Sequence, residues 1–234
     1  MNFNEFLVKY NEIEKPASTI YHKYFSKNGA KLFSFIFVKG NVTPNTISFT
    51  SFLLLIFGCV LLFANSIMIN AIGIVLLQIS YIFDCSDGIV ARYFKMSSSF
   101  GAYLDVLLDR VGGLIFLITI YTCYLLNENT NYPTLVGISL VSCYFYHLSS
   151  SFRPYYFPKL KGYMKKKSQF NLAKAYVKFA YEFIDTGIFY LILSLSLVFG
   201  WLETVAIFYG IIGASLFSAN LFLLYKIESN NKDL

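Results

Sequence analysis

The chain of 234 residues is 56% hydrophobic and 19% aromatic, and only 14% of its residues are charged. This composition excludes an ordinary soluble domain and predicts an integral membrane protein. The formal net charge of +6 is divided among several loops and forms no single basic stripe, which argues against a nucleic-acid-binding protein.

The first 42 residues are predicted to form a cytoplasmic or interfacial helical segment, ahead of one membrane domain over residues 43–234. We expect no secretory signal, because no compact apolar core precedes a small-residue cleavage site. Residues 17–38 combine aromatic and basic side chains, which predicts one or two helices lying at the membrane interface. Thr43 and Pro44 suit an N-cap and a first helical position, and they predict the start of the first span.

Apolar stretches long enough to cross a bilayer, which takes about 20 helical residues, follow one another along the rest of the chain. They predict an all-α protein with six transmembrane helices at about 46–65, 68–92, 102–126, 134–152, 184–201 and 204–225. Residues 171–183 have one apolar stripe and predict an amphipathic helix on the cytoplasmic surface.

The positions of the basic residues predict the orientation of these spans. Lys and Arg lie before the first span, between the second and third, between the fourth and fifth, and at the end of the chain. The turns on the opposite side have none. The positive-inside rule therefore places both termini in the cytoplasm.

Four aspartates lie where the second and third predicted spans approach their shared cytoplasmic turn. Asp84, Asp87, Gly88 and Ala91 follow at i, i+3, i+4 and i+7, and so share one helix face. Gly101, Asp105 and Asp109 follow at i, i+4 and i+8 on the next helix. Because a short turn makes the two helices antiparallel neighbours, we expect the two faces to meet and the four carboxylates to converge.

Four ionised carboxylates at membrane depth repel one another and are costly to desolvate. A divalent cation removes both costs, and oxygen ligands of this kind select Mg²⁺, Mn²⁺ or Ca²⁺. Four carboxylates have room for two such ions, an arrangement suited to displacement at phosphorus. The interleaved Gly and Ala residues fit either a ligand groove or close helix packing, and Arg92 fits either a phosphate contact or an interfacial charge.

The spacing Asp84-x2-Asp87-Gly88-x2-Ala91-Arg92-x8-Gly101-x3-Asp105-x3-Asp109 resembles the complete signature of the CDP-alcohol phosphotransferase family. Members of that family transfer a substituted phosphate from a CDP-linked donor to an alcohol and release CMP. The resemblance implies six spans, a homodimer, and two Mg²⁺ or Mn²⁺ ions bound by the four aspartates, with Asp109 as general base. It also implies a cytidine-nucleotide site at Gly88, Ala91, Arg92 and Gly101, to which the Thr43-Pro44-Asn45 entry to the first helix adds Asn45.

The alcohol acceptor is expected to contact the later spans. Arg110, Arg153 and His147 are the candidate acceptor residues, since a phosphorylated acceptor needs cations, although the nearby aromatic residues suit a quaternary ammonium group. CDP-diacylglycerol is the expected donor, and a CDP-linked polar alcohol with a lipid or polyol-phosphate acceptor is the alternative. The competing class is a cation transporter, which also carries acids within its spans.

Overall fold

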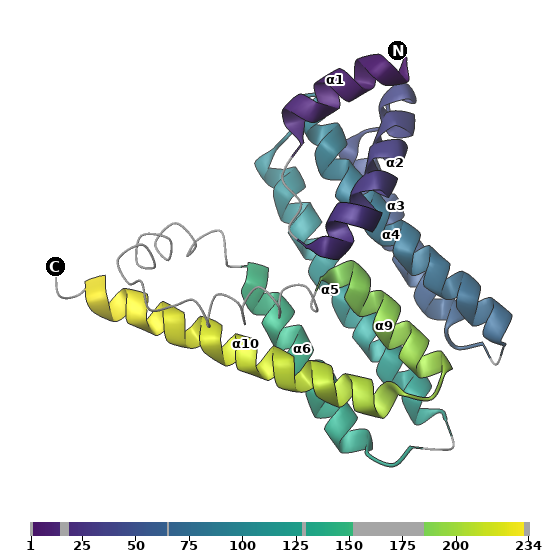
Figure 1. The fold of residues 1–234 in the computed structure, drawn as a ribbon, viewed down its shortest axis with the longest axis vertical. Coiled ribbons are helices and arrows are strands. Elements are labelled where there is room, and N and C mark those ends of the chain that lie inside the picture. The colour runs from purple at the N-terminus through teal and green to yellow at the C-terminus, as the bar shows by residue number, and fades with distance from the viewer. Residues whose placement is uncertain (1, 15–18, 65, 128–129, 152–184, 232–234) are drawn as a thin grey trace.

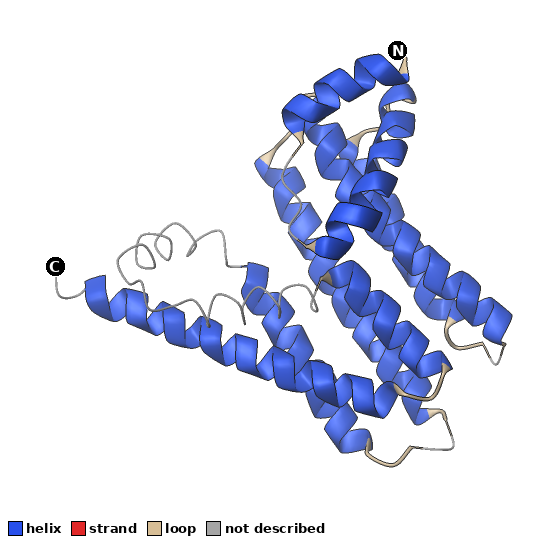
Figure 2. Cartoon of the chain, in the orientation of Figure 1, coloured by secondary structure: helices blue, strands red, loops and turns tan. Residues whose placement is uncertain are grey.

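The computed structural model describes residues 2–14, 19–64, 66–127, 130–151 and 185–231, and within these ranges the chain is all-α. Figure 2 shows helices joined by turns throughout this part of the chain. The helices are α1 (Phe3–Ile13), the short π-helix η1 (His22–Ser26), α2 (Lys27–Lys39), α3 (Pro44–Leu61), α4 (Ile67–Tyr93), α5 (Ser99–Leu125), α6 (Pro133–Ser151), α9 (Thr186–Val198) and α10 (Leu202–Asn231).

The long apolar helices make the chain a multi-pass membrane protein. Within the described residues, four helices are long and apolar enough to cross a bilayer: α3, α4, α5 and the Leu202–Phe222 part of α10. The predicted fourth span coincides with α6, and the predicted fifth span with α9, a shorter apolar helix of 13 residues. Thirteen residues rise by roughly 20 Å, less than the ~30 Å of a hydrocarbon core. The number of spans therefore stays a prediction.

The N-terminal segment, which was predicted to be helical, begins with a helix, α1, that precedes the predicted interfacial helices over 17–38. Asn2 and Glu5 form a capping box at its start, with Asn2 N donating to Glu5 Oε2 at 3.0 Å. Phe6 and Tyr10 of α1 are fully or almost fully buried, and the Phe6 ring stacks on Tyr93 of α4 with 5.7 Å between centroids. The predicted interfacial helices over 17–38 correspond to η1 and α2, whereas the predicted helix over 171–183 lies outside the described residues.

The first membrane helix begins as predicted. Thr43 is the N-cap of α3, its side chain accepts from Thr46 N, and Pro44 occupies the first turn. This cap fixes where Asn45 and the residues after it enter the helix.

A pair of glycines lets α3 pack closely against α4. A Cβ at Gly58 would lie 2.9 Å from Leu77 Cγ, and a Cβ at Gly73 would lie 2.9 Å from Gly58 O. Backbone contact of this kind is the usual role of Gly between membrane helices. It sets the distance between the two helices that carry Ser48 and Asp87.

A smaller apolar cluster joins α1 and α2 to α3 and α4, and the main apolar core lies among α3, α4, α5, α6, α9 and α10. The α3–α4 pair and the α6–α10 pair lie on either side of α5 and α9, and α1 and α2 cover one end of α4 (Figure 1). Phe116 and Ile120 of α5 and Leu193 of α9 are completely buried in this core. The position of α5 and α9 between the two pairs places their polar ends beside α3 and α4.

Candidate active site

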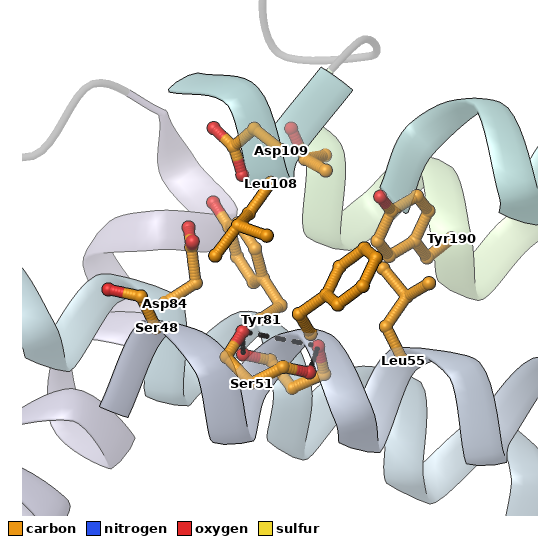
Figure 3. Close-up of a pocket in the computed structure, with 11 residues that line it drawn as sticks. Ser48, Ser51, Leu55, Tyr81, Asp84, Leu108, Asp109 and Tyr190 are labelled. Atoms are coloured by element: carbon orange, nitrogen blue, oxygen red, sulfur yellow. Dashed lines mark hydrogen bonds between the residues drawn. The ribbon is translucent and has the colours of Figure 1, made fainter. Parts of the chain in front are cut away.

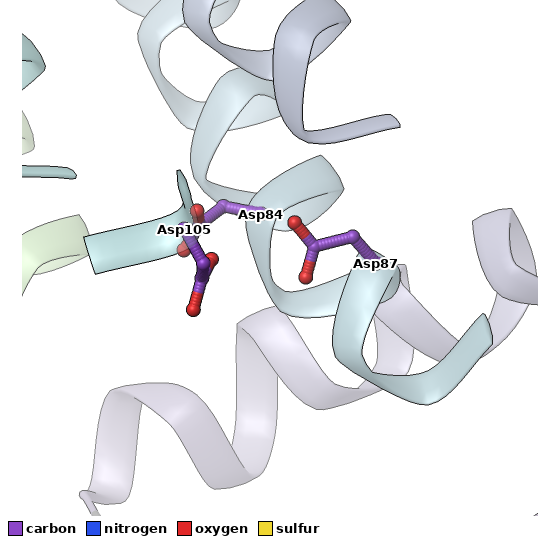
Figure 4. A group of neighbouring side chains, drawn as sticks. All are labelled: Asp84, Asp87 and Asp105. Atoms are coloured by element: carbon purple, nitrogen blue, oxygen red, sulfur yellow. The ribbon is translucent and has the colours of Figure 1, made fainter. Parts of the chain in front are cut away.

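Three of the four aspartates form a compact cluster. Asp84 and Asp87 of α4 and Asp105 of α5 offer carboxylate oxygens that all lie within 4.8 Å of one another, as Figure 4 shows. Asp87 is buried, and Asp84 and Asp105 are partly buried. The antiparallel approach of α4 and α5 across their short turn produces this cluster, as the spacing predicted.

Asp109 lies one turn further along α5 and is more exposed than the other three. Asp109 shares a cavity with Asp84. Both residues line a first cavity between α3, α4, α5 and α9, in which Figure 3 places Asp84, Asp109, Tyr81 and Tyr190. The complete lining is Ser48, Ser51, Phe52, Leu55, Ser80, Tyr81, Asp84, Leu108, Asp109, Thr186 and Tyr190.

A second cavity lies on the other side of Asp109. It contains Arg110 and His147, two of the three residues that the sequence assigned to the acceptor. Arg110 Nε is buried and has no hydrogen-bond partner among the described residues. Arg153, the third, lies outside the described residues. The cavity is lined by Asp109, Arg110, Gly113, Leu117, Tyr144, His147, Thr186, Phe189 and Tyr190.

Asp109, Thr186 and Tyr190 line both cavities. They therefore mark the boundary at which a molecule in one cavity would meet a molecule in the other. The sequence analysis identified Asp109 but not the two α9 residues, because neither belongs to a recognisable motif.

The expected nucleotide residues lie beside the aspartate cluster. A Cβ at Gly101 would lie 3.4 Å from Asn45 Oδ1, so the starts of α3 and α5 bring these two residues together. A Cβ at Gly88 would meet only Arg92 Nη1, at 3.3 Å. Gly88 and Gly101 thus border polar groups, unlike Gly112, whose Cβ would meet Leu55 Cδ1 at 3.1 Å. This contrast favours a ligand groove at Gly88 and Gly101 and helix packing at Gly112.

Arg92 and Ala91 complete this stripe at the end of α4. Arg92 Nε donates to Ile13 O at 3.0 Å, which ties the guanidinium to the last turn of α1. Arg92 Nη1 lies next to Gly88, 3.3 Å from the position of a Cβ there. Helix α1 therefore holds the arginine that the sequence placed in the nucleotide site.

Ser48 is a further site residue that the sequence analysis missed. Its hydroxyl donates to Asp87 Oδ2 at 2.5 Å, across 39 residues of sequence. It lies one turn after Asn45 on α3 and lines the first cavity. Its spacing from Asn45 was the only signal in the sequence.

The aspartate cluster suits a divalent metal ion. Its ligand atoms are all oxygens, the donor type that Mg²⁺ and Mn²⁺ prefer. Within the described part of the chain, Lys27 and Glu14 form an ion pair, but no basic nitrogen lies within 4.0 Å of these aspartate oxygens. No basic side chain there therefore pairs directly with the cluster. The cluster of Asp84, Asp87 and Asp105 is therefore a candidate divalent metal site, and Asp109 follows Asp105 by one turn of α5.

Comparison with known proteins agrees with this geometry. A curated protein of Aquifex aeolicus (strain VF5), named bifunctional IPC transferase and DIPP synthase, is 39% identical over 75 residues, which are 32% of this chain and 17% of that protein. The chain thus spans less than a fifth of that relative's length. The model of the family described as CDP-alcohol phosphatidyltransferase matches residues 41–216, about three quarters of the chain. This range includes α3, α4 and α5. With three of its signature aspartates in one cluster and this match across its membrane helices, the chain belongs to the CDP-alcohol phosphatidyltransferase family.

Proposed function

We propose that this protein transfers a substituted phosphate group from a CDP-linked donor to the hydroxyl of an alcohol and releases CMP. The observation that carries the proposal is the convergence of Asp84, Asp87 and Asp105 beside Asp109, at the boundary of two cavities. The donor phosphates are proposed to bind at the aspartate cluster, and the acceptor hydroxyl to approach Asp109 from the side of Arg110 and His147.

In this reaction the acceptor oxygen forms a bond to the donor phosphorus, and the bond from that phosphorus to the CMP oxygen breaks. Bound Mg²⁺ or Mn²⁺, one or two ions held by the four aspartates, would supply positive charge where the CMP leaving group becomes anionic. Asp109 accepts the hydroxyl proton, since it lines both cavities. Ser48 holds Asp87 in place, and Asn45, Gly88, Ala91, Arg92 and Gly101 bind the cytidine nucleotide.

The donor is proposed to be CDP-diacylglycerol. Val106 and Leu107 on α5, next to Asp105, have 43% and 42% of their surfaces exposed, and Tyr103 has 65%. Exposed apolar residues beside a polar site suit a substrate with a charged headgroup and acyl chains.

The acceptor is proposed to be an anionic alcohol such as a phosphorylated polyol. Arg110 Nε lacks a protein partner among the described residues and faces the second cavity together with His147. Tyr144, Phe189 and Tyr190 also suit a quaternary ammonium group, but the guanidinium charge would repel such an acceptor. A phosphate or other anion would satisfy Arg110.

The proposed topology has six spans, with α6 and α9 as the fourth and fifth and with both termini and the active site in the cytoplasm. Residues 1–42 form the interfacial segment, and residues 43–234 form the catalytic membrane domain. Arg92 and Lys95 at the α4–α5 turn support this orientation, because the turns after α3, α5 and α9 carry no Lys or Arg. A homodimer is proposed on the family resemblance, and crosslinking in native membranes tests it.

A CMP-release assay tests the proposed reaction. Purified protein with Mg²⁺ or Mn²⁺ receives CDP-diacylglycerol or a CDP-linked polar alcohol, each with a panel of alcohols. One pair should release CMP, a chelator should stop release, and Asp109→Asn should abolish turnover but retain CMP binding. Absence of CMP release from every donor, together with metal-ion flux in liposomes, would instead support the cation-transporter alternative.

A further inference from the structure

Asp185 is a buried carboxylate outside the aspartate cluster, and only 7% of it is exposed. It is the N-cap of α9, with Oδ1 accepting from Gly187 N at 3.1 Å. Its Oδ2 accepts from Thr19 Oγ1 at 2.6 Å and from Tyr81 OH at 3.3 Å. One carboxylate thus joins the N-terminal segment, α4 and α9, as an anion at a helix N-terminus with charge-assisted hydrogen bonds.

The same joint contains a second set of contacts. Gln78 of α4 accepts from Tyr21 OH and donates its Nε2 to Gly187 O at 3.3 Å. A Cβ at Gly187 would lie 2.5 Å from Tyr81 Cδ1 and 2.6 Å from Tyr21 Cε1. The first turn of α9 is therefore held at a distance that only glycine permits.

This joint lies beside the boundary of the two cavities. Thr186 directly follows Asp185, and Tyr190 lies one turn further along α9; both line the two cavities together with Asp109. Tyr81 lines the first cavity one turn before Asp84. Any shift of the α9 N-terminus would move Thr186 and Tyr190 relative to Asp109.

We propose that Asp185 is a positioning residue, which fixes α9 through Thr19 and Tyr81 so that Thr186 and Tyr190 align the acceptor with Asp109. Asp185 lines neither cavity, so it acts through α9. The expected effect on KM and kcat rests on the proposed transferase reaction, whereas the expected effect on the position of α9 does not. A 1 Å displacement in such an arrangement costs up to about a hundredfold in rate.

Thr19 offers a variant outside both cavities; its hydroxyl donates to Asp185 and also accepts from His22 N at 3.0 Å. Thr19→Val removes the hydroxyl with little change of volume, whereas Thr19→Ser keeps it. Thr19→Val should raise the acceptor KM roughly tenfold and lower kcat, with the donor KM unchanged. Thr19→Ser should behave as wild type.

Glu203→Gln is a matched control at the other end of the bundle. Glu203 of α10 accepts from Tyr124 OH at 2.5 Å and from Asn131 N at 2.7 Å, so it also joins distant segments, but it lines neither cavity. Its loss should lower Tm and leave both KM values unchanged. If Thr19→Val does the same, the positioning role is wrong.

A labelling experiment tests the position of α9 without using activity. Thr186→Cys is introduced after the four native cysteines are replaced by alanine, and its reaction rate with a water-soluble thiol reagent is measured. Adding Thr19→Val should raise this labelling rate roughly tenfold, the same factor as the expected change in KM. If Thr19→Val does not fold, the milder Tyr81→Phe takes its place. Glu203→Gln should not raise it.

The kinetic and the labelling experiments together distinguish the proposed transferase reaction from the proposed positioning role of Asp185. An unchanged labelling rate overturns the positioning role whether or not the protein releases CMP. Wild-type protein that releases no CMP, with labelling that responds to Thr19→Val, overturns the transferase reaction and keeps Asp185 as the residue that fixes α9.

Discussion

The hydroxyl of Ser48 donates a 2.5 Å hydrogen bond to Oδ2 of Asp87, and so α3 orients a carboxylate that belongs to α4. The same helix begins at the Thr43 cap and brings Asn45 to Gly101 of α5. One helix without an aspartate therefore supports both the proposed metal site and the proposed nucleotide site.

Ser48→Ala should weaken Mn²⁺ binding by roughly tenfold or more, because partners of a metal ligand typically contribute that much to affinity. Isothermal titration with Mn²⁺ in detergent measures it. Thr50→Val is the control, since the exposed Thr50 hydroxyl donates to Thr46 O of its own helix, at 2.8 Å. Equal affinities in Ser48→Ala and wild type would show that Asp87 needs no support from α3.

Asp105→Asn should change the melting temperature in opposite directions with and without metal. In chelator the substitution relieves repulsion among carboxylates within 4.8 Å of one another, so Tm should rise above that of wild type. With Mn²⁺ at a hundred times its Kd, wild type should gain about 2.7 kcal/mol, and the variant should gain less. An equal rise of Tm on addition of Mn²⁺ in the variant and in wild type would contradict a metal role for Asp105.

Arg92→Lys should weaken CMP binding roughly tenfold although it keeps the charge. Lysine lacks the Nε–H that Arg92 donates to Ile13 O at 3.0 Å and cannot form a bidentate contact with phosphate. Competition by CMP in the release assay measures the effect. Lys95→Gln removes an exposed charge in the next turn and should leave CMP affinity unchanged. If Lys95→Gln weakens CMP binding as much as Arg92→Lys, the nucleotide responds to the overall positive charge and not to Arg92 in particular.

Docking of α1 should depend on pH through Glu14. Burial alone would raise the pKa of Glu14, but hydrogen bonds from Lys27 and Tyr10 and the charges of Lys27 and Lys31 outweigh it and lower the pKa. The stabilisation is therefore present above the unfolded value of about 4.3 and is lost as the pH falls through the lower folded value. Hydrogen-exchange protection of α1, corrected for intrinsic rates, should fall in that interval.

Glu14→Gln should lower this protection at neutral pH and remove its pH dependence below about 4.3. Glu12→Gln changes an exposed residue two positions before Glu14 and should retain the wild-type profile. Matching profiles for Glu14→Gln and wild type would mean that another group controls the docking.

Arg110→Gln should distinguish the two kinds of acceptor. For a phosphorylated acceptor, loss of the guanidinium should raise KM by roughly tenfold to a hundredfold, as for other hydrogen bonds to charged groups. Steady-state kinetics with a polyol phosphate and with the matching unphosphorylated polyol measures the difference. A lower KM for a quaternary ammonium alcohol in this variant would favour the aromatic alternative.

The sequence alone determined the helical fold class, the start of α3 and the convergence of Asp84, Asp87 and Asp105, and it identified the family. These features depend on local rules: a cap and a proline mark a helix start, and spacings of three and four residues place side chains on one face. Two antiparallel helices joined by a short turn must then bring their faces together. The capping box of α1 was also readable, at Asn2 and Glu5, but was overlooked.

Only the tertiary structure decided which other residues meet the site. Ser48 reaches Asp87 across 39 residues and Thr19 reaches Asp185 across 166, and no spacing rule predicts such pairs. The same holds for Thr186 and Tyr190, which border both cavities because α9 packs against α4 and α5. A local pattern fixes a face of a helix, but the packing of several helices decides what that face touches.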